Sequence, residues 1–141
     1  MLRSGRRIAC HATDDNHNFE PLDHPACDSF GGFAMILPEE FTYSAVIDAM
    51  EKGKMYASRG PLFEEIAVEN GRLYVRCSPV HSIHVYCGSK EPERVFAPAG
   101  QYLTEGEFKI SSRGQYLRVT VTDWTGRTAD SRGYFREEWE G

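Results

Sequence analysis

The sequence predicts an α+β fold that is mostly β: a short strand–loop–strand–helix region, then an antiparallel, immunoglobulin-like β-sandwich. Beyond residue 61, apolar and polar residues alternate with a period of two, which is typical of half-buried strands. Before that point, only one segment has the apolar spacing of an amphipathic helix. The 141 residues are 40% hydrophobic and 12% aromatic, which is sufficient for a packed core.

The first region, residues 1–60, is predicted to begin with two strands separated by a polar loop. The run at residues 7–13 is typical of a buried strand that leads into a loop. The polar segment at residues 16–25 is predicted to be an exposed loop, and the apolar run at residues 31–37 is short enough to be a second strand.

A helix is predicted over residues 43–52. Thr42 is a suitable N-cap, and Gly53 is suited to the position just after the helix. Residues 54–58 then form a short strand-like link, and residues 59–61 form a turn or hinge.

Residues 61–136 are predicted to form the sandwich, with six or seven strands between residues 62 and 135. Asn70-Gly71 is a strong signal for a two-residue hairpin turn, because both positions need positive φ. Further turns are predicted at Ser78-Pro79, Arg113-Gly114 and Thr125-Gly126. The positions predicted to face inward are Leu73, Val75, Cys77, Ile83, Val85, Cys87, Leu117, Val119 and Val121. His84 has the opposite phase and is predicted at the surface, and residues 137–141 are predicted to be a loose tail.

Composition excludes several functional classes. The formal net charge is −5, and the basic residues form no block apart from Arg3, Arg6 and Arg7, so a nucleic-acid surface is not expected. No apolar run is long enough to cross a bilayer. The N-terminal residues lack the apolar core of a signal peptide, so we expect a cytoplasmic protein with reduced cysteines.

The segment most suggestive of chemistry is Thr13-Asp14-Asp15-Asn16-His17. On an extended backbone, residues i and i+2 point the same way, so Asp15 and His17 could reach one cation together. This mixture of oxygen and nitrogen ligands suits zinc, manganese or iron. Asp14 and Asn16 would then orient the ligands or the loop. A solvated turn with an Asx cap is the alternative.

Arg59 is a second candidate, because a guanidinium group fits the geometry of a phosphate. A charged hinge residue is the simpler interpretation of its position between Ser58 and Gly60.

Four segments carry a resemblance to a known family: RIACHATDDNHN, DSFGGFAMI, AVIDAMEKGKMYASRGP and IAVENGRLYVRCSPV. Together they resemble the C-terminal stretch of PHP (polymerase and histidinol phosphatase) proteins, many of which are metal-dependent phosphoesterases. The resemblance runs from about Gly5 to the end of the chain. It implies that residues 1–60 are the last part of a distorted β/α barrel and that the sandwich is an accessory domain.

The resemblance also implies that Asp15 and His17 match the last metal ligands of the barrel. The family's earlier ligands, including a His-x-His motif, have no counterpart in this sequence. Two side chains cannot hold a catalytic metal tightly, so we expect this chain alone to be an inactive C-terminal part of such an enzyme. In the complete enzyme, metal-activated water would hydrolyse a phosphorylated small molecule or a nucleotide.

The alternative function is a non-catalytic β-sandwich module that binds a ligand or another protein, with a vestigial N-terminal segment. In either case, the apolar faces of residues 8–13, 31–37 and 43–52 would lack barrel neighbours. We expect these faces to pack on the sandwich or to form a homodimer.

Overall fold

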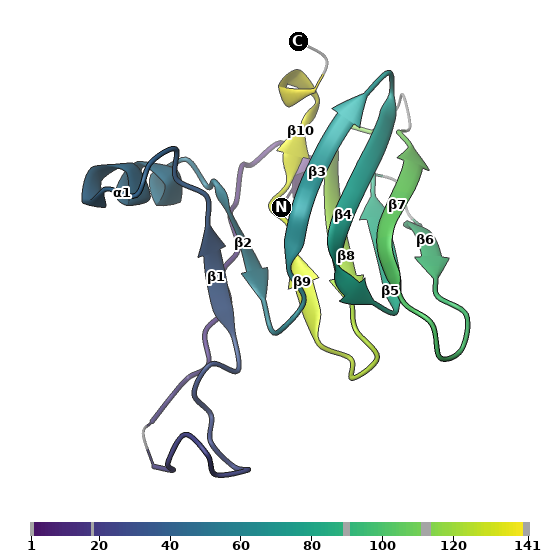
Figure 1. Cartoon of the computed structure of the whole chain (residues 1–141). Coiled ribbons are helices and arrows are strands. Elements are labelled where there is room, and N and C mark those ends of the chain that lie inside the picture. Colours follow the sequence, from purple (N-terminus) through teal and green to yellow (C-terminus); the bar gives the residue numbers. More distant parts are fainter. Residues whose placement is uncertain (1, 18, 89–90, 111–113, 140–141) are drawn as a thin grey trace.

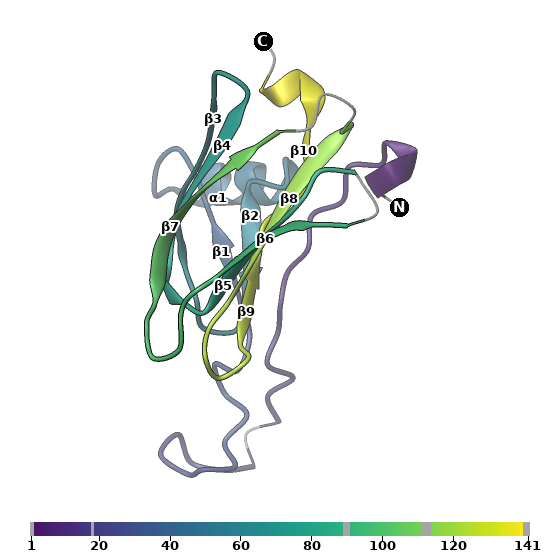
Figure 2. The ribbon, with the colours of Figure 1, turned by 90° about the vertical axis from the view of Figure 1, so that its right-hand side faces the viewer.

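The computed structural model describes residues 2–17, 19–88, 91–110 and 114–139. Two antiparallel sheets lie face to face (Figures 1 and 2). The strands are β1 (Phe33–Ile36), β2 (Met55–Ser58), β3 (Phe63–Glu69), β4 (Arg72–Val80), β5 (Ser82–Tyr86), β6 (Glu93–Phe96), β7 (Leu103–Lys109), β8 (Tyr116–Thr122), β9 (Thr128–Asp130) and β10 (Tyr134–Phe135). The helices are α1 (Tyr43–Glu51) and the 3-10 turns η1 (Leu2–Ser4) and η2 (Arg136–Glu138).

The larger sheet has seven strands in the order β1-β2-β9-β8-β5-β6, with β10 paired to β8. The smaller sheet has three strands in the order β3-β4-β7. The prediction of a mostly-β α+β fold with antiparallel sheets is therefore confirmed, whereas the immunoglobulin-like type stays a prediction. Between residues 62 and 135 the described chain has eight strands rather than six or seven, because the short β9 and β10 add to the sheet.

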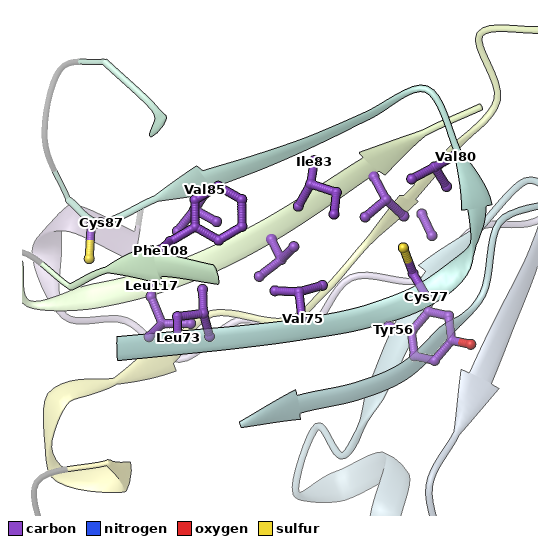
Figure 3. Close-up of a cluster of buried hydrophobic side chains, with 13 residues drawn as sticks. Tyr56, Leu73, Val75, Cys77, Val80, Ile83, Val85, Cys87, Phe108 and Leu117 are labelled. Atoms are coloured by element: carbon purple, nitrogen blue, oxygen red, sulfur yellow. The ribbon is translucent and has the colours of Figure 1, made fainter. Parts of the chain in front are cut away.

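The core lies between the two sheets (Figure 3). All the positions predicted to face inward are buried, and Leu73, Ile83, Val119 and Val121 are completely inaccessible to solvent. Strict alternation of side chains along each strand produces this result, because one face of every central strand packs on the opposite sheet. Burial also raises the pKa of the Cys77 thiol to about 11, so this cysteine is an inert part of the core.

The predicted turns have mixed outcomes. Asn70 and Gly71 have φ values of 51° and 73°, as the predicted hairpin requires, and Gly126 lies in a turn with a φ of 84°. The turn predicted at Ser78-Pro79 is wrong, because both residues lie within β4. The pairing of β4 with β7 shifts between Arg76 and Val80, so an irregularity accommodates the proline inside the strand. Arg113 lies outside the described residues.

The strand predicted at residues 7–13 is wrong. This segment instead runs along the outer side of the larger sheet without strand pairing (Figure 2). Cys10 Sγ lies 4.0 Å from the carbonyl oxygen of Asp130, and a Cβ on Gly32 would lie only 2.7 Å from the carbonyl oxygen of Thr13. Both edges of β2 are already paired, with β1 and β9, so no neighbouring edge of β2 is open to a further strand.

The predicted second strand, helix and link are present as β1, α1 and β2. Thr42 caps α1, because its Oγ1 accepts a hydrogen bond from the Ala45 N–H at 3.3 Å, and Gly53 follows the helix with a φ of 66°. Figure 1 shows that α1 lies to one side of the two sheets. The helix buries only Ala49, and its apolar side chains Tyr43, Ile47 and Met50 are exposed.

The larger sheet continues across residue 60, because β2 pairs with β9 at Ala57 and Ser58. The antiparallel pair β1 and β2 therefore joins the larger sheet through the edge of β2, and the division of the chain at residue 60 stays a prediction. At the other end, Trp139 packs against the core, and residues 140–141 lie outside the described residues. No described helix has the length and apolar character needed to cross a membrane.

Candidate functional site

The Asp-Asn-His segment begins a long loop that leads into β1 and projects away from both sheets (Figure 1). Asp14 joins the two ends of this loop. Its Oδ2 accepts a hydrogen bond from the Phe30 N–H at 2.7 Å, and its Oδ1 accepts one from the Asn16 N–H at 3.4 Å. Asp14 thus links the start and the end of the loop, and its predicted role beside a metal stays a prediction.

Asn16 and His17 contact the returning part of the same loop. The Asn16 side-chain N–H donates to Ser29 Oγ at 2.6 Å, and the His17 backbone N–H donates to Asp28 Oδ2 at 3.1 Å. The same carboxylate oxygen lies 3.7 Å from His17 Nδ1. Asp28 thus accepts a hydrogen bond from the backbone of His17 and lies near Nδ1 of its ring.

Asp15 differs from the sequence-based expectation in its backbone. Its φ is 55°, in the left-handed region, so the segment is not extended at this residue. The expectation that residues 15 and 17 point the same way on an extended strand is therefore wrong in its premise. Asp15 is exposed, and its carboxylate makes no hydrogen bond or ion pair with another described residue. Its pairing with His17 on a metal stays a prediction.

Arg59 lies at the base of this loop. Its Nε donates a hydrogen bond to the Gly31 carbonyl oxygen at 3.4 Å, and its side chain is exposed. A Cβ on Gly31 would lie 3.9 Å from the Asp14 Cβ. The structure therefore places Arg59 and Asp14 next to the same glycine, although they are 45 positions apart in the sequence.

Asp28 is not among the residues that the Asp-Asn-His pattern identifies. In the sequence, Asp28 stands out only as an acidic residue shortly before the apolar run at residues 31–37. Its role depends on the path of the loop, which brings residue 28 back to residue 17. The path of a loop leaves no periodic pattern in the sequence, so this contact could not be predicted.

The types of donor in this loop suit a borderline divalent cation, but their number is too small for a tight site. Within residues 2–17, 19–88, 91–110 and 114–139, no group of three His, Cys, Asp or Glu residues is arranged to hold a metal ion. His17 and Asp28 form a carboxylate–histidine pair, an arrangement that commonly orients a metal-binding imidazole. Such a pair needs further ligands before it can activate water.

His84 was predicted at the surface, but it is half-buried. Its ring centroid lies 5.6 Å from that of Phe96, and its Nε2 is buried without a hydrogen-bond partner among the described residues. Burial, with smaller effects from Arg94 and His81, lowers the pKa of His84. His84 does alternate with the buried residues of β5, as its phase predicts, but Phe96 from the neighbouring strand β6 covers its ring.

Comparison of the chain with family models, with curated proteins and with solved structures returns no match.

Proposed function

We propose that this chain contributes part of the metal site of a PHP-like, metal-dependent phosphoesterase, with Asp15 and His17 as ligands. The main support is the contact between His17 and Asp28, with 3.7 Å between Nδ1 and the carboxylate. A carboxylate at Nδ1 holds the imidazole in place and increases the basicity of its other nitrogen. Zinc, manganese or iron are the cations that this mixture of donors fits.

The chemistry in this proposal is hydrolysis of a phosphoester in a phosphorylated small molecule or a nucleotide. A bound divalent cation lowers the pKa of water and polarises a phosphoryl oxygen. Arg59, at the base of the loop, is the residue that we assign to contact the phosphate. The remaining ligands would come from protein outside the described residues. The proposed setting is the cytoplasm, where reducing conditions keep thiols such as Cys77 reduced.

Calorimetric titration with Zn²⁺ or Mn²⁺ tests the metal assignment. We expect weak binding by the unchanged chain and none by the double variant Asp15→Ala/His17→Ala. The matched control is Asp23→Ala/His24→Ala, which removes the same residue types from the same loop. Equal heats for both double variants would refute the assignment, because they would show that the metal binds the loop without selecting these two residues.

An activity assay tests whether the site is incomplete. We expect no turnover of generic phosphate monoesters or diesters by this chain in the presence of Mn²⁺. Clear turnover that Asp15→Ala abolishes would overturn the expectation that further ligands are required.

The competing function is a non-catalytic binding module. It is favoured by the position of the core, which lies between the sheets and does not involve the loop (Figure 3). A sandwich with its own core does not need the loop for its stability. Absence of metal binding in the calorimetric experiment would favour this alternative.

A further inference from the structure

Two histidines and two aromatic residues pack together on the larger sheet. The ring centroid of His81 lies 4.0 Å from that of Trp124 and 5.5 Å from that of Phe96. The ring of His84 meets the same phenylalanine edge to face, with 5.6 Å between the two centroids. We call His81, His84, Phe96 and Trp124 the histidine–aromatic cluster.

The cluster joins segments that are separate in the sequence. Phe96 belongs to β6, which ends the larger sheet beside β5 (Figure 1). Trp124 lies in the turn between β8 and β9, and its indole N–H donates to the Gln101 carbonyl oxygen at 2.8 Å. The Ala97 N–H donates to the His81 carbonyl oxygen at 2.7 Å. Contacts with the two histidines therefore help to hold β6 and the chain that follows it.

Each histidine has one ring nitrogen that is buried without a hydrogen-bond partner among the described residues. These atoms are Nδ1 of His81 and Nε2 of His84. A neutral imidazole has one donor nitrogen and one acceptor nitrogen, whereas an imidazolium carries an N–H on both. Protonation would therefore place a charged donor without a described acceptor at each buried position, which is unfavourable. The closed cluster suits the neutral form of both rings.

The charged side chains nearest His84 on the neighbouring strands are positive. Arg94 on β6 lies directly opposite His84, and Arg118 on β8 lies diagonally opposite. The Arg118 guanidinium stacks on Tyr86, two positions further along β5, at 4.9 Å from the ring centroid. A proton on His84 would thus add a third positive charge to this face of the sheet.

The carboxylates of the same elements do not compensate for that charge. Glu93 on β6 has the opposite phase from the residue that faces His84. On the other side, Asp130 accepts a hydrogen bond from Thr120 Oγ1 at 2.6 Å. In the turn between β8 and β9, Asp123 Oδ1 accepts hydrogen bonds from the N–H groups of residues 125 and 127, at 2.8 Å and 2.9 Å. None of these three carboxylates forms an ion pair with His84 in the described part of the chain.

These surroundings determine which form of the cluster binds a proton better. Burial, followed by Arg94 and His81, lowers the pKa of His84. Aromatic rings attract cations, but the direction of this pKa indicates that burial and like charges prevail. An opening that returned His84 to water would restore its ordinary pKa of about 6.5. A fall in pH through this value therefore favours the open form.

We propose that the histidine–aromatic cluster is a pH-sensitive conformational switch. Above about pH 7, the neutral imidazoles stay packed beneath Phe96 and Trp124, and β6 stays attached. Below about pH 6, protonation of the two rings separates them from the aromatic side chains and loosens β6 and the chain up to Gln101. The sandwich core remains packed, because the core residues of β5 lie on its opposite face.

Fluorescence of Trp124 tests the switch in a Trp139→Phe background, which leaves one tryptophan in the chain. As the pH falls from about 7.5 to about 5, we expect the emission to shift to the red and iodide quenching to increase, because the indole gains contact with water. His84→Gln should reduce both changes. The matched control is His24→Gln, which removes an exposed histidine from the N-terminal loop and should leave them intact. A loss of intensity without a red shift would show protonation without opening and would overturn the proposal.

Hydrogen exchange tests whether the opening is local. Over the same pH range, the protection factor of the Ala97 amide should fall severalfold. The Ser131 amide, which donates to the Val119 carbonyl oxygen at 2.9 Å, should keep its protection factor. Equal losses at both amides would show that the whole sandwich unfolds and would overturn the proposal. Protection factors are compared because the intrinsic exchange rate itself changes with pH.

An NMR titration of the His84 ring decides the proposal if His84→Gln does not fold. The pKa of His84 should lie below the ordinary value in the unchanged chain and return towards about 6.5 in Phe96→Ala, which removes the cover. An identical pKa in both proteins would refute the role of Phe96. The inference does not depend on the proposed metal site, because the cluster shares no residue with the loop and all titrations contain EDTA.

Discussion

Gly32 controls how closely the candidate metal-binding loop approaches the sheet, and Gly32→Ala should move that loop. The added Cβ would lie 2.7 Å from the Thr13 carbonyl oxygen and 3.3 Å from the Ala12 Cβ. Thr13 therefore has to withdraw by about 0.7 Å to reach the 3.4 Å of ordinary contact. Gly32 does not have a positive φ, so the variant tests space rather than backbone strain.

The segment that includes Thr13 is the part expected to give way, because it has no strand pairing with the sheet. We expect amide chemical shifts of residues 12–17 to change while the free energy of unfolding falls by less than about 1 kcal/mol. If the segment were held rigidly, overpacking would instead cost about 1–3 kcal/mol. Heteronuclear NMR spectra and urea unfolding of the same samples measure the two quantities.

Gly31→Ala is the matched control for this experiment. Its Cβ would approach the Asp28 carbonyl oxygen at 3.3 Å, a much milder contact one residue earlier in the chain. Unchanged shifts in residues 12–17 of Gly32→Ala, together with a loss of stability of about 3 kcal/mol, would refute the expected movement. Equal shift changes in both variants would show that the close approach to Thr13 is not the cause.

Three further predictions concern stability. Leu73→Ala should lower the free energy of unfolding by about 2–5 kcal/mol, because Leu73 is 0% exposed, whereas the exposed Leu22→Ala should change it by less than about 0.5 kcal/mol in the same urea titration. Ser58→Ala should cost about 1–3 kcal/mol, because the buried Ser58 Oγ donates to the Pro61 carbonyl oxygen at 2.6 Å and accepts from the Gly60 N–H at 2.9 Å; a loss below about 0.5 kcal/mol would contradict this. Burial lowers the pKa of His84 in the folded state, so the unfolded chain binds its proton first as the pH falls. The free energy of unfolding should therefore decrease from about pH 7.5 to about pH 5.5, and His84→Gln should show a smaller decrease; an identical pH dependence in both proteins would exclude a role for His84.

The elements that local patterns determine were predictable from the sequence. The central strands follow the alternation of residues such as Val119 and Val121, and the hairpin at Asn70-Gly71 follows from the positive φ that both residues adopt. The bounds of α1 agree within one residue with the prediction from Thr42 and Gly53. In each case, the structural cause lies within a few residues of the signal.

Features that depend on distant parts of the chain were not predictable. Residues 7–13 have the composition of a strand, but whether they pair depends on which sheet edges are already occupied. Pro79 has the character of a turn residue, yet the strand tolerates it because the pairing with β7 shifts nearby. In the candidate site, the left-handed backbone of Asp15 and the contact between His17 and Asp28 both arise from the path of the loop.

The pairing of β2 with β9 has a consequence for the order in which the protein matures during synthesis. Ala57 faces Asp130, so the edge of β2 that does not pair with β1 is completed only by β9, which follows much later in the sequence. On the ribosome, this edge of β2 therefore stays unpaired until β9 has emerged. The candidate metal-binding loop precedes β1 and β2, and so it is translated well before the strand that completes its support.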